Sequence, residues 1–240
     1  MFIWEGPEML QVQNLRAGYG ALPIIHDLSF SIAKGETLVL LGRNGVGKST
    51  LLKALIGINP ASAGKIMLNG HDVAGWVPNR LARAGIAYVP QGRGIFPKLT
   101  VEENLRVGLR ARRDGQRHIP TDILAMFPIL SERMHQLGGT FSGGQQQILA
   151  LARALCAAPD LLLLDEPSEG IQPSIVLQIG DLLKTVTRDL GLTVLLVEQN
   201  LELARRAATR CLVMEKGRIA GALSADDLQD ERLVFNALAL

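Results

Sequence analysis

The segment Gly42-Arg-Asn-Gly-Val-Gly-Lys-Ser-Thr50 fits the pattern G-x-x-x-x-G-K-[ST] of a phosphate-binding P-loop. Its glycines permit positive φ angles and let main-chain N–H groups approach a ligand closely. A helix that begins near Lys48 adds the positive end of its dipole. The pattern predicts that Lys48 reaches the β- and γ-phosphates of a nucleotide and that the Ser49 hydroxyl binds Mg²⁺. The predicted nucleotide-binding residues of this segment are Gly42, Arg43, Asn44, Gly45, Val46, Gly47, Lys48, Ser49 and Thr50.

The sequence on either side of the loop supports this prediction. Glu36–Leu41 has the pattern of a buried strand that runs into the loop, and Ser49–Ile56 has that of a helix leaving it. A strand, a glycine loop and a helix in this order distinguish a P-loop from a glycine-rich turn with a stray lysine.

Length and composition set the class of protein. A chain of 240 residues with 48% hydrophobic residues predicts one domain, or one core with an embedded subdomain. A net charge of +2 gives no strong signal for nucleic acid or an anionic membrane. No apolar run approaches the length of a membrane-spanning helix.

The chain ends and the cysteines predict little chemistry. Residues 1–8 lack the features of a secretory signal, so we expect a loose N-terminal extension, with Met9 as an alternative start. Cys156 and Cys211 have no metal-binding spacing and are expected to be buried free thiols in a reducing compartment.

The N-terminal part predicts a small antiparallel β-subdomain beside the P-loop. Met9–Leu15 and Ile24–Ile32 alternate apolar and polar residues, with Tyr19 in a glycine turn between them. Lys65–Leu68 continues the strand-rich pattern, and Asn69–Gly70 is a hairpin signal.

The middle of the chain predicts an inserted helical subdomain over residues 92–141. Pro78–Ala84 is expected to be a short helix and Gly85–Val89 a buried strand, which places Gln91 at a strand end where α/β sheets bind ligands. The capping box at Thr100 starts a helix that runs to about Leu109. This region is locally basic, which fits either a solvated face or contact with a partner protein or lipid headgroups.

Two later motifs carry candidate chemistry. Ser142 is a natural N-cap for a helix over Gln145–Ala157, and the two glycines between them leave N–H groups open to an anion. Leu161–Pro167 is a buried strand that ends in Asp165 and Glu166. Acidic residues at this position are costly unless they serve a cation or a reaction.

The last third of the sequence completes an alternating α/β pattern. We expect a helix from Pro173 to about Leu190 and a buried strand over Thr193–Val197, followed by Glu198 and Gln199. Arg210–Glu215 and Arg218–Ala220 are predicted to be closing strands, and a short C-terminal helix is predicted to begin at Ser224–Asp227.

The order of these motifs resembles that of the ATP-binding cassette (ABC) ATPases, from about residue 9 to residue 222. The pair formed by S-G-G-Q and the later L-L-L-L-D-E-P is specific to that family among P-loop proteins. The resemblance implies an α/β fold: a P-loop NTPase (RecA-like) core with an antiparallel β-subdomain and an inserted helical subdomain at 92–141. It implies a single domain over residues 9–240.

The resemblance also implies a role for each motif, with ATP and Mg²⁺ as cofactors. Tyr19 is similar to the aromatic residue that stacks on adenine, and Gln91 to the residue that contacts Mg²⁺ and signals to a membrane partner. The signature that closes on the ATP of a second subunit would be Ser142, Gly143, Gly144 and Gln145.

The implied catalytic residues are Lys48, Glu166 and Gln199, and the implied metal site consists of Ser49, Gln91 and Asp165. Asp165 would bind Mg²⁺ through water, while Glu166 would orient or deprotonate the attacking water. Gln199 would contact the γ-phosphate or that water, although it could instead cap a helix that begins near Asn200.

Two departures from the usual family pattern indicate a particular branch of the family. Gln199 replaces the usual switch histidine, and Ser168–Gln172 lacks the usual aspartate after D-E-P. Both features resemble the importers of branched-chain amino acids and of urea and short-chain amides, whose two ATPases form an unlike pair. P-S-E-G-I-Q-P, V-P-Q-G-R-G-I-F and G-R-N-G-V-G-K are most similar to the urea/amide branch.

The expected function is therefore that of the ATP-hydrolysing subunit of an importer. Its partners would be a second ABC ATPase, in a homodimer or heterodimer, membrane-spanning permease subunits and, indirectly, a solute-binding protein, with no nucleic acid. It would lie peripherally on the cytoplasmic face of the inner (plasma) membrane. The alternatives are an exporter ATPase and a soluble non-transport ABC ATPase. No residue here is expected to select the solute.

One apolar cluster follows the Gln91 loop, formed by Ile95, Phe96 and Leu99. We expect it to face a groove that receives a cytoplasmic helix of the membrane subunit. The alternative is packing inside the helical subdomain.

Overall fold

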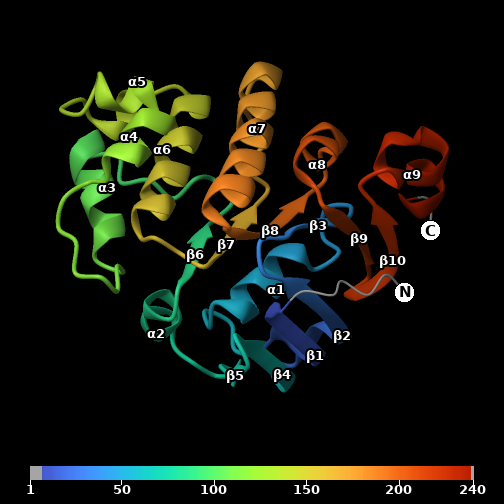
Figure 1. Cartoon of the computed structure of the whole chain (residues 1–240). Helices are drawn as coiled ribbons and strands as arrows, with labels where there is room; N and C mark the ends of the chain where they lie inside the picture. Colours follow the sequence, from blue (N-terminus) through green and yellow to red (C-terminus); the bar gives the residue numbers. More distant parts are fainter. Residues whose placement is uncertain (1–6, 239–240) are drawn as a thin grey trace.

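A computed structural model describes residues 7–238 as two β-sheets with helices around them (Figure 1). The larger sheet has the order β10 (Arg218–Ser224), β9 (Arg210–Glu215), β3 (Thr37–Leu41), β8 (Thr193–Glu198), β7 (Leu161–Asp165) and β6 (Ile86–Val89). All its pairs are parallel except β9 with β10. The smaller sheet is antiparallel, in the order β2 (Leu22–Ala33), β1 (Glu8–Tyr19), β4 (Ala63–Leu68) and β5 (His71–Asp72).

Nine helices connect and cover these strands in the described part of the chain, with one-turn 3₁₀ segments at Gly138–Thr140 and Asp227–Gln229. The helices are α1 (Lys48–Leu55), α2 (Pro78–Arg83), α3 (Val101–Leu109), α4 (Thr121–Met126), α5 (Pro128–Ser131), α6 (Gly143–Cys156), α7 (Pro173–Leu190), α8 (Leu201–Ala207) and α9 (Glu231–Leu238).

The larger sheet separates two hydrophobic cores. Alternate residues of a strand point to opposite faces, so Leu161 and Leu163 of β7 pack toward α1 and the antiparallel sheet, while Leu162 and Leu164 pack toward α6 and α7. All four side chains are fully buried. The continuous apolar run before Asp165 is therefore explained by burial on both faces.

The helical insertion lies to one side of this sheet. Helices α3, α4 and α5 group with α6 at the left of Figure 1, between β6 and β7 in the chain. Asn104, which is fully buried on α3, ties that helix to the loop after β6 by donating to the Phe96 carbonyl (3.0 Å) and accepting from the Phe96 N–H (2.9 Å).

The parallel strands bring the predicted motifs to one edge. The register pairs Leu41 with Glu198 and Asp165 with Val197. The P-loop after β3, the acidic pair at the end of β7 and the segment after β8 therefore meet beyond the carboxyl ends of neighbouring strands, where open α/β sheets bind ligands.

The fold confirms the predicted fold class, while both chain ends differ from the prediction. Residues 1–6 of the predicted extension lie outside the described residues. Glu8, by contrast, already belongs to β1 and pairs with Ala33 of β2. At the other end β10 runs through Ser224, and the helix predicted to begin at Ser224–Asp227 is there only a one-turn 3₁₀ segment over Asp227–Gln229. Ser224 and Asp227 exchange hydrogen bonds at 2.8 and 3.0 Å and form a turn, and α9 starts at Glu231 instead.

Candidate nucleotide site

The P-loop has the backbone that its glycines predict. Gly45 and Gly47 have φ of 81° and 112°, in the region that favours glycine. A Cβ at Gly42 would lie 2.6 Å from the Met214 carbonyl oxygen, so this position also requires glycine. Within the described residues, the N–H groups of Gly45 to Lys48 form no hydrogen bond, and they are available as a cradle for an anion.

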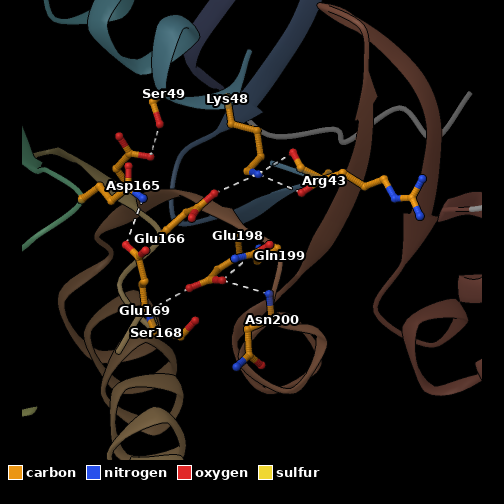
Figure 2. Close-up of polar contacts among 12 residues, drawn as sticks. Arg43, Lys48, Ser49, Asp165, Glu166, Ser168, Glu169, Glu198, Gln199 and Asn200 are labelled. Carbon is orange, nitrogen blue, oxygen red and sulfur yellow. Dashed lines mark hydrogen bonds and ion pairs between the residues drawn. The ribbon is translucent and has the colours of Figure 1, made fainter. Parts of the chain in front are cut away.

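Lys48 is the buried cation of this site, with 3% of its surface exposed. Its ammonium donates to the carbonyls of Gly42 (2.8 Å) and Arg43 (3.0 Å) and forms an ion pair with Glu166 at 2.9 Å (Figure 2). The strand–loop–helix turn and the acidic end of β7 are thus joined through one side chain.

Asp165 and Ser49, two residues of the predicted metal site, are in contact. The Ser49 hydroxyl donates to Asp165 Oδ1 at 2.9 Å, and the Tyr88 hydroxyl donates to Oδ2 at 3.0 Å. Burial raises the pKa of Asp165, while the hydrogen bonds from Ser49 and Tyr88 lower it. Burial, together with the charge of Asp165, raises the pKa of Tyr88, so the phenol keeps its proton and acts as a donor.

The residues at this point fit a magnesium ion. A serine hydroxyl and a carboxylate are hard oxygen ligands, and Mg²⁺ usually takes one or two protein ligands and completes its shell with water and phosphate oxygens. Residues 7–238 contain no cluster of three or more His, Cys, Asp or Glu able to form a metal cage by themselves. Ser49 and Asp165 would therefore hold the ion together with the nucleotide.

Glu166 follows Asp165 with φ of 46°, an uncommon conformation for a residue with a side chain. Its N–H donates to the Val197 carbonyl at 2.9 Å, and its carbonyl accepts from the Glu169 N–H at 3.1 Å. This left-handed turn directs the carboxylate toward Lys48 rather than toward Ser49 (Figure 2).

Gln91 lies beside the site and is exposed to solvent. Its amide donates to Oε2 of Glu169 at 2.9 Å, so the Gln91 side chain contacts the segment that follows Glu166. In the described structure it makes no hydrogen bond to Ser49 or Asp165, so its role as a metal ligand stays a prediction.

Gln199 is exposed at the end of β8, and the cap of the next helix belongs to its neighbour. Asn200 Oδ1 accepts from the N–H groups of Glu202 (2.9 Å) and Leu203 (3.1 Å) at the start of α8. The capping alternative for Gln199 is therefore wrong. Gln199 lines a cavity of about 1210 Å³ together with Arg43 and Asn44, and residues of α8 and α9 also line it.

Of the remaining predicted binding residues, Tyr19 and Ser142 are exposed, while Gly144 is buried. Tyr19, 50% exposed, ends β1 at the turn into β2. Ser142 accepts from the Gln145 N–H at 3.4 Å, and the Gln145 side chain accepts from the Ser142 N–H at 3.1 Å, which forms a capping box at the start of α6. The helix begins at Gly143, two residues earlier than predicted.

Comparison with known proteins identifies the family. The family described as "ABC transporter" matches residues 25–169, more than half of the chain. The chain belongs to the ABC transporter family. It is an ATP hydrolase of that family, and the matched residues include the P-loop, the S-G-G-Q segment and the acidic strand end.

Individual relatives cover almost the whole chain. The high-affinity branched-chain amino acid transport ATP-binding protein BraG of Pseudomonas aeruginosa is 44% identical over 88% of this chain and 91% of its own length. The probable branched-chain amino acid transport ATP-binding protein LivF of Archaeoglobus fulgidus is 37% identical over 92% and 94%. The lipopolysaccharide export system ATP-binding protein LptB of Haemophilus influenzae is also similar, at 32% identity over 94% and 95%.

Solved structures agree with the fold. The ADP conformation of an ATP-binding cassette of an ABC transporter is similar, with a TM-score of 0.80 at 26% identity, covering 95% of this chain and 97% of that one. A cassette of this family thus binds an adenine nucleotide in the same fold. Within residues 7–238, no helix of this ABC ATPase has the length and apolar character needed to cross a bilayer.

Three residues of the site were missed by sequence reasoning. Tyr88 holds Asp165, Glu198 is fully buried at the end of β8, and Arg93 donates to Gln146 Oε1 (3.1 Å) and to the Gly170 carbonyl (3.4 Å). Burial raises the pKa of Glu198, and several N–H donors oppose that shift. The one available signal was the charge of Glu198 directly after four apolar residues, the same pattern that identified Asp165.

Proposed function

We propose that this protein is the ATP-hydrolysing subunit of an importer for small polar solutes of the branched-chain amino acid, urea and short-chain amide class. The observation that carries this proposal is the 44% identity to BraG over 91% of that protein's length. The replacement of the switch histidine by Gln199 and the segment Ser168–Gln172 support the same class.

The chemistry proposed for the site follows from its contacts. Phosphoryl transfer needs positioning and charge stabilisation more than covalent help. Lys48 and the free N–H groups of the P-loop would bind the β- and γ-phosphates, and Tyr19 would stack on adenine. Glu166, held at the end of β7, would accept the proton of the attacking water or orient it.

Mg²⁺ would be held by Ser49 and Asp165, with Gln91 as a further ligand, and supplies positive charge to the phosphate oxygens when bound. Tyr88 keeps the Asp165 carboxylate in place by donating to the oxygen that Ser49 does not use. Gln199 would donate to a phosphate oxygen and accept from water, because an amide has both capacities.

The proposed assembly contains a second ABC ATPase subunit, as a homodimer or heterodimer, and membrane-spanning permease subunits, with a solute-binding protein acting indirectly. The chain would be peripheral, on the cytoplasmic face of the inner membrane. Ser142–Gln145 would cover the nucleotide of the second subunit, with the exposed Ser142 at its edge and Gly143 and Gln145 partly exposed beside it.

Transport by a reconstituted complex tests this proposal. The chain is co-purified with the permease and ATPase subunits encoded beside it and placed in vesicles with its solute-binding protein. We expect ATP-driven uptake of one of leucine, urea or acetamide, and no uptake with Lys48→Ala. ATP-driven movement in the export direction, which the similarity to LptB keeps as the second candidate, would contradict the importer proposal.

A further inference from the structure

Glu198 is a buried carboxylate that the proposed chemistry does not use. It ends β8, and its side chain is 0% exposed. An ionised carboxylate in such a place is costly unless hydrogen bonds satisfy its oxygens. The donors that satisfy it here come from two loops, both of which carry proposed site residues.

Each oxygen of Glu198 serves a different loop (Figure 2). Oε1 accepts from the Ser168 N–H at 3.0 Å, in the segment that follows Glu166. Oε2 accepts from the N–H groups of Gln199 and Asn200, both at 2.9 Å. One carboxylate thus connects the loop after β7 with the loop after β8.

The first loop is the left-handed turn that carries Glu166. A φ of 46° in a residue other than glycine persists only when its surroundings hold it. Two main-chain hydrogen bonds fix the turn: the Glu166 N–H donates to the Val197 carbonyl, and the Glu169 N–H donates to the Glu166 carbonyl. Ser168 lies between these points, and Glu198 accepts its N–H.

The second loop is the one that presents Gln199. The Gln199 side chain is exposed, so its orientation depends on the main chain that carries it. Glu198 holds this main chain by accepting from the N–H groups of Gln199 and Asn200. The main-chain carbonyl of Glu198 also accepts from the Gly42 N–H at 3.3 Å, at the start of the P-loop.

We propose that Glu198 is a positioning residue for ATP hydrolysis, which holds the Glu166 turn and the Gln199 loop in a fixed relation to each other. This inference rests on the proposed roles of Glu166 and Gln199. A glutamine at this position has the same shape but one acceptor oxygen, and its NH₂ group would face a main-chain donor. Glu198→Gln therefore releases one of the two loops.

The experiment compares the full-length wild type and Glu198→Gln in ATP turnover, ATP binding and thermal unfolding. We expect kcat to fall about 10- to 100-fold, because small displacements of catalytic groups cost factors of this size. The Kd for ATP should stay within about twofold, since the P-loop is tied to Glu198 through main-chain atoms that the substitution leaves in place.

Glu36→Gln is the matched control. Glu36 is also 0% exposed, and its carboxylate accepts from Arg210 Nε (2.8 Å) and from the Ala33 N–H (2.8 Å). It precedes β3, at the opposite end of the sheet from Glu198. This variant should lower the unfolding temperature while kcat stays near the wild-type value.

Two results would overturn the inference. One is a folded Glu198→Gln protein with wild-type kcat. The other is a Glu36→Gln protein that loses kcat in the same proportion, which would show that any loss of a buried carboxylate weakens turnover through stability. Both readouts concern ATP turnover and not transport, so an exporter or a different solute would leave them unchanged. In a Gln199→Ala background, Glu198→Gln should still lower kcat, because the Glu166 turn remains affected.

Discussion

Gln199 is the residue whose chemistry distinguishes this site from one with a histidine at the same position. Its amide can donate to a phosphate oxygen and accept from water, but it cannot take up a proton near neutral pH. It is exposed beside Arg43 and Asn44, while Asn200 caps α8 in its place. Among residues 7–238 its side chain makes no hydrogen bond, which leaves the amide available to a ligand.

Substitution of Gln199 tests this role. Gln199→Ala should lower kcat by about tenfold with little effect on ATP binding, because one hydrogen-bonding group is lost near the reacting atoms. Gln199→His should retain activity and add a pH-dependent limb near pH 6–7, set by the reference pKa of histidine, about 6.5. ATP turnover against pH for the three proteins decides it, and a wild-type rate in Gln199→Ala would show that the side chain has no part in turnover.

Two elements, α6 and β9, bury the cysteines as expected. Cys156 and Cys211 are 0% exposed, and burial raises the pKa of each thiol to about 12. The thiolate is the reactive form, so a raised pKa means that reaction becomes appreciable only at higher pH.

Alkylation measures this protection. At pH 8, iodoacetamide should label both cysteines of the native protein about a thousandfold or more slowly than an ordinary thiol, because so little thiolate is present. In urea both cysteines should react quickly at the same pH. Rapid labelling of the native chain would mean that α6 or β9 opens readily.

The segment between β6 and α3 presents Phe96 at the surface. Its ring is 44% exposed and lies 5.2 Å from the guanidinium of Arg153. The main chain at this point is held by Asn104 rather than by the ring. Ile95 of the same cluster packs against the hydrophobic core, so internal packing applies to Ile95, and docking on the membrane subunit stays a prediction for Phe96.

Phe96→Ala should weaken assembly with the permease by about 1–2 kcal/mol, as loss of an aromatic anchor does at interfaces, while unfolding stability changes little. Asn104→Ala is the contrasting control, since it leaves buried main-chain groups unpaired and should destabilise the chain by about 1–3 kcal/mol. Co-purification and thermal unfolding of both variants are the measurements. A large loss of stability in Phe96→Ala would favour internal packing.

The sequence predicted those features that depend on neighbouring residues, and it missed those that depend on contacts between distant parts of the chain. The P-loop and the strand before Asp165 were predictable because glycine spacing and an apolar run specify backbone and burial within a few residues. The roles of Tyr88 and Glu198 were not, since their partners lie 77 and 30 residues away in the chain. The start of α9 was missed because Ser224 bonds Asp227 in a turn that resembles a helix cap in sequence.

At the scale of the whole molecule, the site is open on one side. Within the described residues, no hydrogen bond or ion pair joins Ser142–Gln145 to Gly42–Thr50. The proposed arrangement therefore places the S-G-G-Q segment of one ATPase subunit over the nucleotide of another. An isolated chain should be a weak ATPase that gains activity on assembly.

A variant that binds ATP without hydrolysing it should reveal this assembly. Glu166→Gln should lower turnover by about 10²–10⁴, the usual effect of losing a positioned base, and should form a two-cassette complex in ATP, alone or with the partner ATPase. Adding Lys48→Ala should return the chain to a monomer, because the phosphates then lose their cation. Size-exclusion chromatography with light scattering measures both. A monomer under every one of these conditions would contradict the shared site.

The ion pair between Lys48 and Glu166 has a consequence for the order of events. The Lys48 ammonium already contacts three oxygens, those of the Gly42 and Arg43 carbonyls and of the Glu166 carboxylate. A triphosphate must replace some of these contacts to bind Lys48. The affinity for ATP therefore depends on the difference between the contacts that Lys48 gains and those that it loses. When the phosphates take the ammonium, the Glu166 carboxylate is set free at the same moment. In the proposed mechanism, ATP binding therefore makes the Glu166 carboxylate available for the hydrolysis step that follows.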